Sequence, residues 1–107
     1  MRGGKMAIHG FQELQDLLQN VNKEEMYVNI CRNIKKFRLE KYNEFKKQNL
    51  NISINPYSTE NISTLLDYNH NHYKRFESEN DSTKMIPLEK LVKLSIILDK
   101  RLDDFIR

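Results

Sequence analysis

Residues 57–77 have the sequence YSTENISTLLDYNHNHYKRFE, and this stretch decides the fold. Ser58 is a good helix N-cap, and an apolar stripe at helical spacing follows it at Ile62, Leu65 and Leu66. Asn69 is a second N-cap candidate, and one side of the helix that would follow it is apolar at Tyr73 and Phe76. The stretch therefore predicts two short helices, over residues 58–66 and 69–77, joined by a tight turn.

Helical patterns continue on both sides of this pair. Before it, acidic residues at 24 and 25 suit a first helical turn, and apolar residues share one face as far as Phe45, which predicts a helix from about Lys23 to about Lys47. After it, Pro87 suits the first turn of a helix that runs to Leu98, and residues 102–106 predict a last short helix.

Two further segments have patterns of their own. Apolar residues from Phe11 to Val21 recur at helical spacing and predict a short amphipathic helix near the N-terminus. Leu50, Ile52 and Ile54 alternate with polar residues, which predicts a short strand or an extended loop. Because the chain has only 3 Gly and 2 Pro, a turn-rich all-β fold is disfavoured, and we expect an all-α fold.

The composition bounds the class of protein. A chain of 107 residues is one domain, and its net charge of +3 permits a polyanionic partner without requiring one. The charge is uneven, since residues 23–50 hold eight Lys or Arg and four Asp or Glu, whereas residues 51–80 hold two and four. The N-terminal residues lack the apolar stretch of a secretory signal and no apolar segment could cross a membrane, so we expect a cytoplasmic protein with no membrane partner.

The order and spacing of these elements resemble the lambda-repressor-like (Cro/CI, xenobiotic-response-element) helix-turn-helix DNA-binding family. Residues 34–41 resemble its first helix, residues 57–77 its helix-turn-helix core, and residues 86–98 and 102–105 its last two helices. The resemblance implies a five-helix domain over residues 27–107, preceded by an extension over 1–26 with its own short helix. Residues 42–56 are an insertion between the first two family helices. Asp67 stands where the family usually has Gly, and Asp tolerates a left-handed backbone better than most residues.

The same resemblance implies a set of functional residues. In the family, residues at the start of the recognition helix and one turn later reach base edges, and these match His70, Asn71 and Arg75. Contacts to DNA phosphates are implied for Thr59, Asn69, Lys74 and Lys84. Arg38 and Glu77 match an ion pair that ties the first helix to the recognition helix. The alternatives are an ordinary solvated helix face and two unrelated surface charges.

Other chemistries fit the sequence poorly. His70 and His72 lie about 200° apart on a helix and do not converge on one metal ion. There is no glycine-rich phosphate loop, and Cys31, the one cysteine, lies on an apolar stripe where a small buried side chain is expected. We therefore expect no enzyme, no metal and no cofactor.

These observations predict a sequence-specific double-stranded DNA-binding transcriptional regulator, a small repressor of the phage, plasmid or antitoxin type. We expect it to bind as a homodimer. The candidate dimer contacts are the N-terminal stripe (Phe11, Leu14, Leu18), residues 50–54, or Phe105 and Ile106. Packing of the N-terminal stripe on its own core is an equal alternative. Because of the insertion and the acidic balance of residues 51–80, an alternative function is a protein-interaction module that binds another regulator or a toxin through the same fold.

Overall fold

The computed structural model describes residues 8–48, 54–78 and 85–107. In these residues the chain is all-helical and contains no strand, so the expected all-α class is confirmed. The helices are α1 (Phe11–Leu18), α2 (Lys23–Lys47), α3 (Thr59–Leu65), α4 (His70–Phe76), α5 (Leu88–Leu98) and α6 (Leu102–Ile106). None of the helices in the described parts is long and apolar enough to cross a bilayer.

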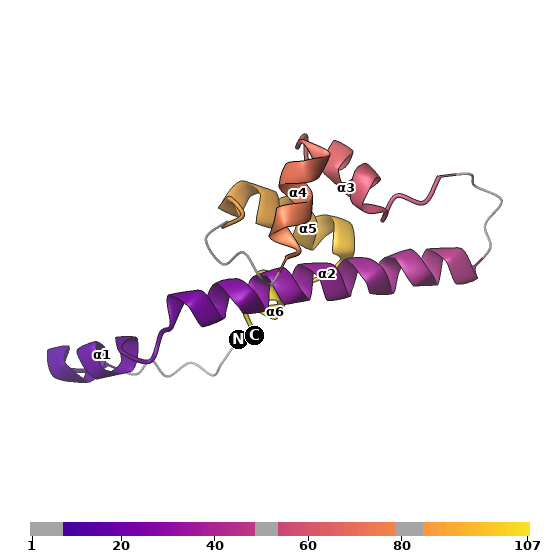
Figure 1. Ribbon diagram of the computed structural model, residues 1–107. Helices are drawn as coiled ribbons and strands as arrows, with labels where there is room; N and C mark the ends of the chain where they lie inside the picture. Colours follow the sequence, from indigo (N-terminus) through magenta and orange to yellow (C-terminus); the bar gives the residue numbers. More distant parts are fainter. Residues whose placement is uncertain (1–7, 49–53, 79–84) are drawn as a thin grey trace.

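α2 is the longest element and organises the others. Its 25 residues span about 37 Å, and α3, α4 and α5 lie together on one side of it (Figure 1). The side chain of Asn22 caps its start by accepting a hydrogen bond from the Glu25 amide, and Lys46 and Lys47 occupy its last turn, where cations are favourable. The expected bounds, from about Lys23 to about Lys47, are therefore confirmed.

The core lies between the middle of α2 and the three helices on its side, and α6 closes it. α2 contributes a buried stripe at helical spacing, and its Phe37 meets Phe105 of α6 edge to face with ring centroids 5.2 Å apart. Cys31 is buried in this stripe, as expected for a small apolar side chain. Among the described residues, the side chains with no exposed surface are Ile34, Ile62, Leu66, Tyr73, Leu94, Leu98 and Phe105.

α3 and α4 form a tight unit, called here the α3–α4 unit. Ser58 caps α3 by accepting from the Asn61 amide, and Asn69 caps α4 by accepting from the amides of Asn71 and His72, so both predicted N-caps are confirmed. Between the helices Asp67 has a φ of 57°, the left-handed conformation that a tight turn requires. The turn closes with the Tyr68 amide donating to the Ser63 carbonyl at 2.9 Å.

α5 and α6 follow the predicted pattern with a small shift. Pro87 is the N-cap of α5 rather than a residue of its first turn, and Asp99 ends the helix with a φ of 56°. Asn33 of α2 donates to the carbonyl oxygens of Phe105 (2.8 Å), Arg107 (3.2 Å) and Asp104 (3.3 Å). These bonds satisfy carbonyls that the end of a helix leaves without partners, and they fasten α6 to α2.

The insertion is described at its two ends. α2 occupies residues 42–47 of it, and the chain resumes at Ile54, which is exposed. The strand or extended loop predicted around Leu50 and Ile52 lies outside the described residues. On the far side, Asn55 donates to the Tyr42 carbonyl at 3.2 Å and accepts from the Tyr57 amide at 2.9 Å. This side chain joins the end of the insertion to α2.

α1 contributes nothing to the core. Every residue from Ile8 to Glu25 is exposed, and α1 lies beyond the N-terminal end of α2, away from the α3–α4 unit (Figure 1). The alternative that its apolar stripe packs on its own core is therefore wrong. The linker over residues 19–22 brings no residue of α1 to the buried stripe of α2, which begins at Ile30.

Candidate nucleic-acid interface

The two buried residues of α4 determine which of its side chains face outward. Tyr73 and Phe76 fill the core, so the opposite side of the helix presents Asn71 and Arg75, which are four residues apart and lie one above the other. Both are exposed, and Lys74 beside them is exposed as well. Of the three predicted base contacts, the structure brings Asn71 and Arg75 together on one open face.

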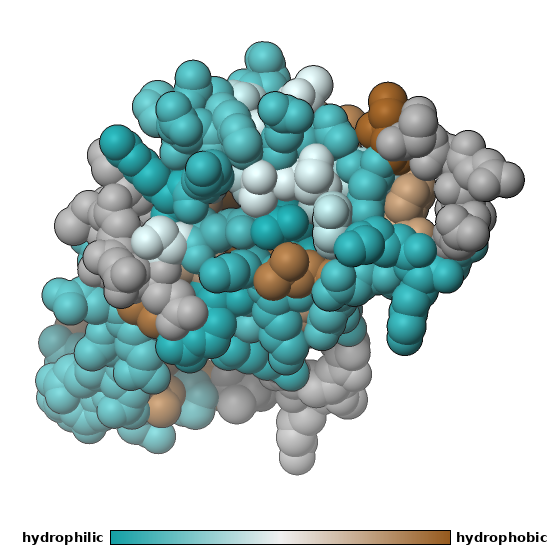
Figure 2. Space-filling view, turned by 45° about the vertical axis from the view of Figure 1, so that its right-hand side comes forward, coloured by the Kyte–Doolittle hydropathy of each residue, from teal (hydrophilic) through white to brown (hydrophobic). Residues whose placement is uncertain are grey.

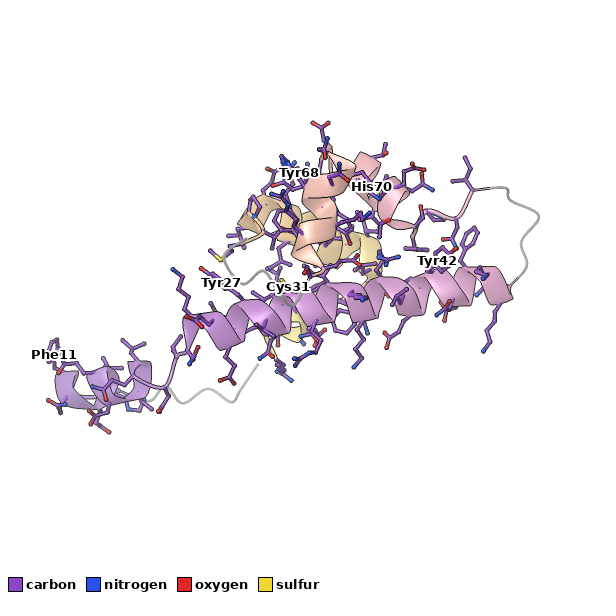
Figure 3. All side chains as sticks on the ribbon, viewed as in Figure 1. Phe11, Tyr27, Cys31, Tyr42, Tyr68 and His70 are labelled. Atoms are coloured by element: carbon purple, nitrogen blue, oxygen red, sulfur yellow. The ribbon has the colours of Figure 1, made fainter. Side chains whose placement is uncertain are left out.

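His70, the third predicted base contact, is engaged within the protein. Its ring nitrogen Nε2 lies 2.8 Å from the hydroxyl oxygen of Thr59, and both residues are half-buried. In Figure 3 His70 lies on the side of α4 that is close to α3. Two residues that the sequence assigned to base and phosphate contacts therefore bond to each other and fix the distance between the starts of α3 and α4.

Of the three remaining predicted phosphate contacts, Asn69 and Lys74 lie within the described residues. Asn69 is exposed at the start of α4, although its side-chain oxygen is occupied by the amides of Asn71 and His72. Lys74 is exposed on the outer side of the same helix. Lys84 lies outside the described residues.

A buried ion pair joins α2 to the end of α4. Arg38 of α2 donates from Nε to Oε2 of Glu77 at 2.6 Å and from a terminal nitrogen to Oε1 at 3.1 Å, which is the two-pronged geometry expected for this pair. The Tyr73 hydroxyl also donates to Oε2 of Glu77, at 2.5 Å, and Arg38 reaches the Tyr57 carbonyl at 3.0 Å. One cluster of charge-assisted bonds thus joins α2, the start of α3 and the end of α4.

The cluster changes the acidity of one of its members. Burial raises the pKa of the Tyr73 hydroxyl far above its usual range, and the negative charge of Glu77 and its hydrogen bond raise it further. The phenol therefore stays protonated and remains a donor to Glu77. The sequence indicated the Arg38–Glu77 pair but missed the hydroxyl, although a Tyr four residues before a buried Glu on a helix is placed to reach it.

A lysine supports the turn between α3 and α4. Lys90 of α5 donates to the Leu66 carbonyl at the end of α3, at 2.8 Å, and its ammonium lies 5.1 Å from the centre of the Tyr68 ring. This position satisfies a carbonyl at a helix end and neutralises the negative end of α3. This contact could not be predicted from the sequence, because it joins residues 24 apart whose meeting depends on tertiary packing.

The outer surface of the unit is polar. Hydrophilic residues cover most of the upper end of the molecule, where α3 and α4 lie (Figure 2). The charged side chains exposed on α4 are the cations Lys74 and Arg75, whereas α3 and the turn expose the carboxylates of Glu60 and Asp67. The cationic side of the unit is therefore α4 itself.

A shallow cleft of about 210 Å³ lies beside α4. It is lined by Tyr68, His72, Arg75, Phe76, Met85 and Pro87. It is smaller than the 300–1,000 Å³ typical of small-molecule pockets, and the described residues contain no cluster of three or more His, Cys, Asp or Glu side chains that could hold a metal ion. What the site offers is an exposed helical surface rather than an enclosed chamber.

No family model, curated protein or solved structure matches this chain.

Proposed function

We propose that this chain is a sequence-specific double-stranded DNA-binding protein that acts as a small transcriptional regulator, with α4 as its recognition helix. The observation that carries the proposal is the joint exposure of Asn71 and Arg75 on one side of a helix whose other side is locked into the core. Such a helix can enter a major groove as a rigid body. The order of the helices, which resembles the lambda-repressor-like family, supports the same reading.

The chemistry of the exposed face suits base recognition. An Asn amide pairs with both edge atoms of adenine, and an Arg guanidinium pairs with both acceptors of guanine. Lys74 lies beside them and is assigned to a phosphate, together with Asn69 at the helix start. Because Thr59 and His70 bond to each other, they position the two helices, and a role in DNA contact requires that bond to open.

The electrostatics of α4 support the proposal. A carboxylate at the end of a recognition helix would repel phosphate, but Glu77 is buried and its charge is compensated by Arg38. A single module of this size covers little DNA, so we expect two copies on half-sites about 34 Å apart. We propose a binding protein and no catalytic role.

Selection from a pool of random double-stranded oligonucleotides tests this function. The chain should enrich one motif with two related halves, and binding should weaken steeply as salt is raised. Arg75→Ala should weaken binding to that motif by about 1–3 kcal/mol while binding to unrelated duplex stays nearly unchanged. Arg101→Ala is the matched control, because it removes the same side chain from an exposed position at the start of α6.

Two results would contradict the proposal. One is the absence of an enriched motif together with no duplex binding at low salt. The other is an equal loss of affinity for both kinds of duplex in Arg75→Ala, which would reduce Arg75 to a phosphate contact.

A specific feature favours a second candidate function, a module that binds another regulator or a toxin. Leu65 at the end of α3 is 54% exposed, and the carboxylates of Glu60 and Asp67 are exposed on the same α3–α4 unit. A surface that exposes an apolar side chain and two carboxylates suits a basic protein surface better than a phosphate backbone. Failure to bind duplex at any salt concentration would favour this function over the first.

A further inference from the structure

The shallow cleft beside α4 combines an apolar floor with a cationic rim. It lies between α4 and the residues that lead into α5, and its apolar lining consists of Tyr68, Phe76, Met85 and Pro87. The rings of Tyr68 and Phe76 meet at 48° with their centroids 5.3 Å apart, so they form two walls at an angle. Figure 3 shows Tyr68 beside α4. Such a corner suits a flat apolar group that can contact both rings.

Two polar side chains of α4, His72 and Arg75, complete the lining of the cleft. They are three residues apart, so they are neighbours on the helix surface, and both are exposed. Within the described residues, no hydrogen bond or ion pair engages the guanidinium of Arg75 or the imidazole of His72. A guanidinium offers a carboxylate two parallel hydrogen bonds, and a neutral imidazole donates from one of its two nitrogens.

The carboxylates that adjoin the lining residues in the sequence are each compensated by a cation. Glu77 is paired with Arg38, and Glu89 lies 2.8 Å from the ammonium of Lys93. The hydrogen bond with Glu89 raises the pKa of Lys93, and the charge of Asp67 raises it further, so the same ammonium counters both carboxylates. The uncompensated charge at the cleft is therefore that of its guanidinium, which favours an anion.

We propose that this cleft binds a small aromatic carboxylate with a single ring. A cavity of about 150 Å³ holds one benzene ring. The cleft of about 210 Å³ therefore has room for one ring and its carboxylate, although not for a drug-sized molecule. The ring lies against Tyr68 and Phe76, the carboxylate accepts the two hydrogen bonds of Arg75, and His72 supplies a further donor.

Other small ligands match only one half of this lining. Acetate or inorganic phosphate would pair with the guanidinium and leave the two aromatic rings in contact with water. A neutral aromatic molecule such as benzamide would cover the rings and leave the guanidinium without a counter-charge. The combination of ring and carboxylate is what satisfies both halves at once.

The cleft shares one residue with the proposed DNA-binding face. Arg75 cannot pair with a guanine base and with a ligand carboxylate at the same time, so a bound ligand weakens the binding of duplex. The inference thereby deepens the proposed function by giving it a small-molecule regulator, and only this consequence rests on that function. Binding of the ligand itself is measured without DNA, so the two can fail separately.

Titration of the isotope-labelled full chain with benzoate, followed by NMR at constant ionic strength, tests the site. Benzoate should shift the amide signals of Tyr68, His72, Phe76 and Met85 in a saturable way, with a dissociation constant on the order of 1 mM. Benzamide, acetate and inorganic phosphate should each bind about 10-fold more weakly, because each lacks either the charge or the ring.

Two matched variants assign the carboxylate contact. Arg75→Gln should raise the dissociation constant for benzoate about 10-fold, and the site is exposed, so the variant keeps the fold. Arg101→Gln makes the same change at an exposed position at the start of α6 and should leave the constant unchanged.

The result that would overturn the inference is the absence of saturable shifts at the amides of the cleft. Equal affinity for benzoate and acetate would also overturn it, because the site would then be a general anion contact. Benzoate at about ten times its dissociation constant should weaken duplex binding about 10-fold, and no change would contradict the shared use of Arg75. Benzoate binding by a chain that binds no duplex would support the cleft and overturn the proposed function.

Discussion

Arg38 and Glu77 are the charged side chains buried in the described part of the core. Arg38 is 7% exposed, it compensates Glu77, and it holds the Tyr57 carbonyl just before α3. Taking an ion pair out of water is costly, and the pair is tolerated here because both carboxylate oxygens of Glu77 accept hydrogen bonds. The role we assign to this pair is to fix the angle of α4 rather than to add net stability.

Removing one partner of the pair should expose this cost. Arg38→Met should lower the free energy of unfolding by about 3–5 kcal/mol, because it leaves the Glu77 carboxylate buried without its cation. The double variant Arg38→Met with Glu77→Gln should recover most of the loss, since the amide carries no charge and still accepts from Tyr73. Urea unfolding measures both. A loss below 1 kcal/mol in the single variant would mean that the pair is solvated.

The Tyr73 hydroxyl should make the free energy of unfolding depend on pH in the alkaline range. Its pKa is raised in the folded state, so its contribution to stability is present below its unfolded value near 10 and is lost as the pH rises above it. Above pH 10 the free energy of unfolding should fall by about 1.4 kcal/mol more per pH unit than in Tyr73→Phe. Parallel pH profiles for the two proteins would contradict this burial.

The positions of the candidate site residues could be predicted from the sequence where they depend only on helical spacing and capping. Spacing along α4 placed Asn71 and Arg75 outward and Tyr73 and Phe76 inward, and the caps at Ser58 and Asn69 fixed where the short helices begin. The bond between Thr59 and His70 could not be predicted, because it depends on the distance between two helices. The spacing of residues along one helix does not determine that distance.

At the scale of elements, the helices followed their sequence patterns closely. α2 has the expected bounds because its caps, charges and apolar spacing agree, and the turn before α4 tolerates Asp67 in the left-handed conformation. The attachment of α6 was not foreseen. A helix of five residues is too short to be stable alone, and it depends on Phe105 in the core and on Asn33 of α2.

That dependence predicts the effect of a substitution in α2. Asn33→Ala should lower the free energy of unfolding by about 1–3 kcal/mol, because the carbonyls at the end of α6 lose their donor. In this variant the amide hydrogens of α6 should also exchange with solvent faster than those of α5. Asn43→Ala is the control, because it makes the same change at an exposed position of the same helix. Equal exchange rates in α6 of both variants would show that Phe105 alone holds this helix.

At the scale of the whole molecule, the chain divides into a packed part and an arm. The three helices on one side of α2, with α6, bury the core, while α1 extends away from it and carries exposed apolar residues (Figure 1). The sequence indicated the amphipathic character of α1 but not its position, because periodicity identifies an apolar face without identifying what covers it. Because none of its residues is buried, α1 adds little to the folding stability of one copy.

This division predicts that α1 can be removed without loss of folding stability. A variant that starts at Asn22 keeps the cap of α2, and every described residue that it lacks, 8–21, is exposed. At protein concentrations too low for association, its free energy of unfolding should equal that of the full chain within about 0.5 kcal/mol. Leu94→Ala, at a fully buried position, should by contrast cost about 2–5 kcal/mol in the same assay. A loss comparable to that of Leu94→Ala on removing α1 would mean that the arm folds back onto its own core, because only buried apolar surface contributes on that scale.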